Sequence, residues 1–137
     1  MPFTPLRCEE IVLRALLKKG WIDDETKRIK ADAFILDPAK DHDGLSVNIQ
    51  ARTDIAVWLG SFNTSYGADS LHTGRVNALG LVVGQTAADV LEHPEHAVIT
   101  GIPSSEDDTA RAESLASALA HICRPVERTP RKRQKRR

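Results

Sequence analysis

The most chemically varied stretch of the sequence lies between residues 65 and 83 and reads SYGADSLHTGRVNALGLVV. It places His72 shortly before Arg75, with Tyr66 and Asp69 just upstream. An imidazole can act as a general base near neutral pH, and a guanidinium can hold a phosphate or carboxylate in a forked pair. The four residues therefore define a hypothetical catalytic group for a small hydrolase, nuclease or group transferase. The same stretch also fits a structural loop followed by a helix cap, which is the interpretation we favour.

A second candidate is the pair His93 and His96, whose spacing would let two imidazoles reach one metal ion. Zinc needs three or four converging ligands, and no third ligand accompanies the pair. Pro94 between them suits a turn better than a regular helix. We interpret the pair as surface histidines in a turn and expect no metal site.

Signatures of common cofactor and nucleophile sites are missing from the chain. It contains neither GxxxxGK[ST] nor GxGxxG, which cradle nucleotides, and neither GxSxG nor HExxH, which mark hydrolases. We therefore expect no cofactor, and a non-catalytic protein is the better hypothesis.

The end of the chain, VERTPRKRQKRR, carries a strong positive charge. From Arg124 onward there are eight basic residues and one acid, Glu127, whereas the preceding 123 residues hold 11 basic and 18 acidic groups. Lysine and arginine neutralise phosphates and release counterions, which favours sequence-independent nucleic-acid binding. The segment has no aromatic residue that could stack on bases. The candidate contacts are Arg128, Arg131, Lys132, Arg133, Lys135, Arg136 and Arg137.

Other interpretations of the basic segment stay open. It could fold back onto its own acidic body, bind an acidic partner, or be a solvated end without a function. No apolar residue follows Val126, so the segment can bury little surface to offset its ordering entropy. We expect a compact domain over residues 1–122 and a disordered tail over residues 123–137.

An N-terminal helix over residues 5–19 is predicted from its cap and its spacing. Thr4 and Pro5 suit the N-cap and the first helical position, and Gly20 is a natural stop. Leucines recur between them at helical spacing, at Leu6, Leu13, Leu16 and Leu17.

Further elements follow from alternation and capping signals. Residues 45–49 alternate apolar and polar side chains, and with the apolar run 33–36 they predict an antiparallel hairpin that turns at Asp43–Gly44. Residues 81–83 and 96–103 are two more strand candidates. Helical turns should begin at Thr53 and Asp54 and at the capping box Thr86–Asp89. A C-terminal helix is predicted over about 105–122.

Together these elements predict a small single domain of the α+β class. Its hydrophobic fraction of 41% is ordinary, and no apolar run is long enough to span a membrane. Cys8 and Cys123 are too few for a disulfide framework, and the chain starts without a secretory pattern, so we expect a cytoplasmic protein.

Three functions are compatible with the sequence. The first is an accessory protein whose acidic body docks a protein partner while its basic end contacts nucleic acid or an acidic surface. The second is the small enzyme built on His72 and Arg75. The third is a neutralising partner of the antitoxin type, since acidic bodies suit basic targets. The sequence does not indicate an oligomeric state.

Overall fold

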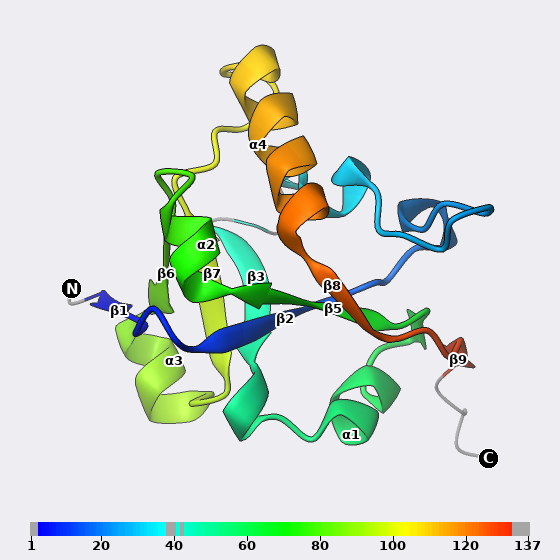
Figure 1. Ribbon diagram of the computed structural model, residues 1–137. Coiled ribbons are helices and arrows are strands. Elements are labelled where there is room, and N and C mark those ends of the chain that lie inside the picture. The colour runs from blue at the N-terminus through cyan, green and yellow to red at the C-terminus, as the bar shows by residue number, and fades with distance from the viewer. Residues whose placement is uncertain (1–2, 38–40, 42, 133–137) are drawn as a thin grey trace.

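The computed structural model describes residues 3–37, 41 and 43–132, and it is built around one antiparallel sheet (Figure 1). The spatial order of the seven strands is β1-β6-β7-β3-β2-β5-β8, and every neighbouring pair is antiparallel. Their bounds are β1 Thr4–Pro5, β2 Ile11–Ala15, β3 Leu45–Ile49, β5 Ala68–His72, β6 Val82–Gln85, β7 His96–Thr100 and β8 Arg124–Glu127. A second, two-stranded sheet pairs β4 (Thr64–Ser65) with β9 (Arg131–Lys132).

The helices are short apart from the last. They are α1 Ile55–Gly60, α2 Thr73–Asn77, α3 Ala87–Glu92 and α4 Thr109–Ile122, with three 3-10 turns, η1 Lys19–Trp21, η2 Ala31–Phe34 and η3 Gln50–Arg52. The broad class, a small domain of mixed helices and strands, is confirmed, but the sheet dominates it. Among the described residues, none of the helices is both long enough and apolar enough to cross a lipid bilayer.

The predicted N-terminal helix over residues 5–19 is wrong. Its centre is β2, an inner strand of the sheet between β3 and β5. Val12 and Leu13 are both fully buried, although their side chains point to opposite faces of the strand. A strand covered on both faces carries a nearly continuous apolar run, and such a run also contains apolar residues at the intervals expected of a helix. The leucine pattern therefore could not separate the two structures.

The predicted hairpin between 33–36 and 45–49 is also wrong, although residues 45–49 do form the strand β3. Residues 31–34 form η2, which packs on α4, and β3 pairs with β7 and β2 instead. Gly44 does not serve a hairpin turn. It has a φ of 136°, and a Cβ there would lie 2.6 Å from the carbonyl oxygen of Ile99, so the glycine permits the close approach of β3 to β7.

The elements with capping signals are confirmed. Asp54 caps α1 by accepting a hydrogen bond from the backbone N–H of Val57, and Thr86 and Asp89 form the expected capping box of α3. Strands β6 and β7 lie where two strands were expected. The C-terminal helix begins at Thr109, later than predicted, because Asp108 is its cap and accepts from the N–H of Arg111.

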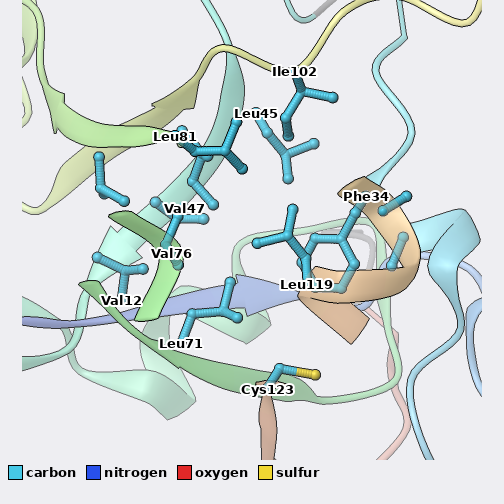
Figure 2. Packing of buried hydrophobic residues seen from close by; sticks show 14 of the residues in the cluster. Val12, Phe34, Leu45, Val47, Leu71, Val76, Leu81, Ile102, Leu119 and Cys123 are labelled. Carbon is cyan, nitrogen blue, oxygen red and sulfur yellow. The ribbon is translucent and has the colours of Figure 1, made fainter. Parts of the chain in front are cut away.

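Both faces of the sheet carry buried side chains. The main core lies between the sheet and the α4 side, where Phe34 and Leu119 pack together with strand residues such as Leu45 and Leu71 (Figure 2). A smaller cluster of Ala15, Leu59 and Ala68 lies apart from it and joins β2 and β5 to α1. The sheet is thus covered on one face by a long helix and on part of the other by a short one.

The predicted disordered tail over residues 123–137 needs correction for its described part. Residues 124–127 are β8, which forms one edge of the large sheet against β5, and residues 131–132 are β9. Backbone pairing supplies the ordering energy that the apolar content of the segment does not. Residues 133–137 lie outside the described residues.

Candidate functional site

Within the hypothetical catalytic group, Asp69 lies apart from His72. Asp69 and His72 are separated by three positions on β5, so their side chains point to opposite faces of the sheet. Asp69 is 1% exposed, whereas His72 and Arg75 are exposed. Within the described part of the chain, no hydrogen bond or ion pair joins any two of His72, Arg75, Asp69 and Tyr66. The stretch that was expected to be a loop instead contains β4, β5 and α2.

Asp69 is the partner of the C-terminal segment. Its Oδ1 lies 2.5 Å from Nη1 of Arg128, and its Oδ2 accepts a hydrogen bond of 3.2 Å from the thiol of Cys123. Oδ1 receives no hydrogen bond of good geometry, so the Arg128 contact is best described as a close ion pair. Arg128 also donates from Nε to the carbonyl oxygen of Lys27 over 3.0 Å. One buried carboxylate thus holds the chain at Cys123 and at Arg128, on both sides of β8.

The two thiols of the chain lie in contrasting environments. Burial, and then the negative charge of Asp69, raise the pKa of Cys123, which is 6% exposed. Cys8 is exposed. The thiolate is the reactive form, and each unit of pKa changes its population tenfold. We expect iodoacetamide to alkylate Cys8 at least about 100-fold faster than Cys123 in the folded protein. Peptide mass spectrometry over a time course measures both rates, and equal rates would contradict the buried Cys123–Asp69 contact.

Two of the seven predicted nucleic-acid contacts use their guanidinium groups inside the molecule. Arg128 is the partner of Asp69, and Arg131 donates from Nη1 to the carbonyl oxygen of Ala56 over 3.3 Å and lies 3.6 Å from the carboxylate of Glu127. Lys132 is exposed. The other four, Arg133, Lys135, Arg136 and Arg137, lie outside the described residues. The basic segment therefore begins with anchoring arginines.

The histidine pair has separate partners. The Nδ1 atom of His96 lies 2.8 Å from Oδ1 of Asp89, the residue that also closes the capping box of α3. The Nδ1 atom of His93 lies 3.9 Å from the carboxylate of Glu95. In the ranges that the structure describes, no three histidine, cysteine or acidic side chains gather closely enough to hold a metal ion.

Sequence reasoning missed Arg14, a buried charge in the middle of the sheet. The pairing of β2 with β3 covers Val12 and Leu13 and then stops, while β2 stays paired with β5. The guanidinium of Arg14 bridges the gap, since Nη1 donates to the carbonyl oxygen of Ser46 over 3.0 Å and Nε donates to that of Ala33 over 2.9 Å. A charged residue inside the apolar run IVLRALL was the available signal.

A cavity of about 860 Å³ opens beside this arginine. Its charged and aromatic lining includes Arg14, Lys18 and Trp21, and the guanidinium carbon of Arg14 lies 5.2 Å from the centre of the Trp21 ring. Burial lowers the pKa of Arg14 to about 10, with the charge of Asp41 acting in the opposite direction. The side chain is therefore still charged at neutral pH. None of His72, Arg75, Asp69 and Tyr66 lines this cavity.

The fold and these contacts define a class only at the level of architecture: a small domain with an antiparallel seven-stranded sheet, one long helix and a basic C-terminal segment paired into the sheet edge. Comparisons with protein-family models, with curated protein sequences and with solved structures return no match. A function must therefore be argued from the residues themselves.

Proposed function

We propose that the protein is a non-catalytic nucleic-acid-binding accessory protein whose basic C-terminal end contacts the phosphate backbone. The observation that supports this function is the anchoring of the segment by β8, β9 and the Arg128–Asp69 ion pair. The anchor brings the chain to Lys132 at a fixed place on the fold. Five basic residues then stand at or after that point: Lys132, Arg133, Lys135, Arg136 and Arg137.

The contrast between the acidic body and the basic C-terminal end indicates how the nucleic acid would be bound. The body before Arg124 has 18 acidic and 11 basic residues, so it repels a polyanion and does not extend the contact. No aromatic residue lies at or after Arg124. The proposed binding is therefore electrostatic and independent of base sequence.

Neutralising the terminal cations should weaken nucleic-acid binding and reduce its dependence on salt. The variant carries Arg133→Gln, Lys135→Gln, Arg136→Gln and Arg137→Gln. Each lost phosphate contact lowers the slope of log K against log salt by about 0.9 on duplex DNA, so we expect the slope to fall by about 3 to 4. Fluorescence anisotropy with an arbitrary labelled duplex, measured over a series of salt concentrations, gives the slope.

A matched control removes the same charge from the body. It carries Arg7→Gln, Lys19→Gln, Lys30→Gln and Arg111→Gln, all at exposed positions. We expect its slope to change by less than about 1, because no phosphate contact is lost. Equal effects of the two variants would show that net charge alone governs binding, and an unchanged slope in the terminal variant would refute the proposed function.

We also propose that the acidic body docks a protein partner in the cytoplasm. Leu91 on α3 is 84% exposed and Val57 on α1 is 70% exposed, and apolar side chains of this kind are the ones that a partner would cover. The free thiols Cys8 and Cys123 agree with a reducing compartment. An enzyme built on His72 and Arg75 is not proposed, because no hydrogen bond or ion pair among the described residues joins the two side chains.

A further inference from the structure

We propose that the nucleic acid bound by the basic C-terminal end is single-stranded, and that Trp58 and Phe62 stack on its bases. The inference rests on the proposed function, which supplies the phosphate contact, and it adds the class of nucleic acid that the site takes. The two rings form an edge-to-face pair, with centres 5.9 Å apart and planes inclined by 67°. Both residues are half-buried, so part of the pair is open to a ligand.

The ring pair lies beside the anchored basic segment. Helix α1 contacts β9, and the Nη1 atom of Arg131 donates to the carbonyl oxygen of Ala56 on that helix over 3.3 Å (Figure 1). Lys132 is paired with Thr64, which follows Phe62 by two residues. Paired strands lie about 5 Å apart, so the first exposed cation of the basic end is close to the rings. A strand whose phosphates follow the basic end therefore passes the ring pair.

Packing holds the rings in place before any ligand binds. Both rest on the small cluster of Ala15, Leu59 and Ala68. The carbonyl oxygen of Ala68 also accepts a hydrogen bond of 3.4 Å from Nη1 of Arg128, so the cluster adjoins the anchor of the basic end. Rings that are fixed in advance lose little conformational entropy when a base stacks on them.

The helix contributes ring surface to this contact and no positive charge. Helix α1 contains no basic residue, and Asp54 caps its start. Phe62 also lines the cavity beside Arg14, whose lining includes Asp32 and Asp41. Carboxylates repel phosphates, so the phosphates run on the β9 side of the rings. The phosphate contact is thus left to the basic end, and the rings contact the bases alone.

Stacking on these rings requires bases that are not already stacked in a duplex. In a double helix each base face is covered by its neighbours, whereas an unpaired base can turn onto an aromatic side chain. Every base has such a face, so the binding stays independent of base sequence. Aromatic rings beside a cationic path are the combination by which proteins bind single strands in this way. The geometry therefore favours a single strand over a duplex.

The fluorescence of Trp58 reports stacking directly. The chain has two tryptophans, so Trp21→Phe leaves Trp58 as the only one. Three labelled probes of about 12 nucleotides are titrated into this variant at low salt: oligothymidine, an abasic strand with the same phosphates, and a duplex. We expect saturable quenching by oligothymidine alone, although anisotropy shows that all three bind. Oligothymidine should bind at least about fivefold more tightly than the abasic strand. Equal affinities of these two strands, or oligothymidine binding without quenching, would overturn the inference.

A pair of phenylalanine variants tests the second ring. Phe62→Leu should weaken oligothymidine binding at least about fivefold. It should leave abasic-strand binding and the salt slope unchanged, because no phosphate contact is lost. Phe3→Leu is the matched control, since Phe3 is also half-buried but lies against Gly84 of β6, far from β8 in the strand order. Equal effects of the two variants would refute the stacking role of Phe62. Thermal unfolding shows whether Phe62→Leu is folded, and if it is not, the quenching of Trp58 decides.

The same probes separate this inference from the proposed function. If all three bind through the terminal cations, but the abasic strand binds as tightly as oligothymidine, the phosphate contact stands and the stacking does not. If none of them binds, or if binding does not depend on the terminal cations, the proposed function fails and the stacking inference fails with it.

Discussion

Replacing Asp69 with asparagine is expected to lower the free energy of unfolding by about 3 kcal/mol or more. The change keeps the shape of the side chain but removes the charge that Arg128 faces in a largely buried position. Breaking a buried ion pair by neutralising one partner costs about 3 to 5 kcal/mol, because the other charge stays buried without compensation. Urea unfolding measures the loss, and the melting temperature should fall by roughly 10 °C for a chain of this size.

The matched control for Asp69 is the other carboxylate of the same segment. Glu127 accepts hydrogen bonds from the backbone N–H of Arg128 and from the hydroxyl of Thr129, and it is only half-buried. Glu127→Gln should therefore shift the urea unfolding midpoint far less than Asp69→Asn does.

A double-mutant cycle separates the ion pair from other effects of the substitution. Arg128→Met removes the charge on the other side and keeps the length of the side chain. The double variant should lose less free energy of unfolding than the two single variants lose together. The reason is that Arg128→Met removes the charge that Asp69→Asn leaves unpaired. Additive losses, or an Asp69→Asn variant within about 1 kcal/mol of the parent protein, would show that this ion pair does not hold the segment.

The elements that the sequence predicts correctly are those with local signals. Asp54 accepts a hydrogen bond from the backbone N–H three residues ahead of it, and in the Thr86–Asp89 pair each side chain accepts from the backbone N–H of the other, so the sequence alone contains all of the interacting groups. The two strands β6 and β7 carry short apolar runs between glycines or a proline. Elements that are selected by interactions between residues close in the sequence can therefore be predicted from the sequence.

The errors occur where distant pairing selects the structure. β2 is a strand because β3 and β5 lie on either side of it, and nothing within residues 5–19 distinguishes this from an amphipathic helix. The C-terminal segment shows the same limit. A count of cations treats Arg128 and Lys132 alike, although one faces a buried carboxylate and the other is exposed.

The cavity beside Arg14 was missed for a related reason. Arg14 stands out in its apolar run, but the gap it fills exists only because β2 and β3 separate after Leu13. The wall and rim of the cavity come from segments as distant as Trp21, Ser46 and Phe62. The residue type could therefore be flagged from the sequence, but the cavity could not.

Gly67→Ala is expected to detach β8 from the edge of the sheet. Gly67 has a φ of 138°, which an L-residue rarely adopts, and a Cβ there would overlap the carbonyl oxygen of Glu127. The obstacle is backbone, so no side-chain rotation can relieve it, and β8 must move away from β5. Strain of this kind costs about 1 to 3 kcal/mol before the lost pairing is counted, so we expect a total loss of about 3 kcal/mol or more.

Trypsin distinguishes local detachment from general destabilisation. Trypsin should cut a detached segment after Arg128 and Arg131 under native conditions, at rates at least about tenfold above those of the parent protein. The reason is that the segment no longer has to open locally before cleavage, and losing an opening cost of about 1.4 kcal/mol or more raises the rate about tenfold. Gly20→Ala is the matched control, since a Cβ there meets no atom within 4 Å. It should change the free energy of unfolding by less than about 0.5 kcal/mol and leave the cleavage rates unchanged. If Gly67→Ala keeps Arg128 as protected as Gly20→Ala does, the pairing of β8 with β5 cannot be what anchors the basic end, and the proposed presentation of the terminal cations loses its basis.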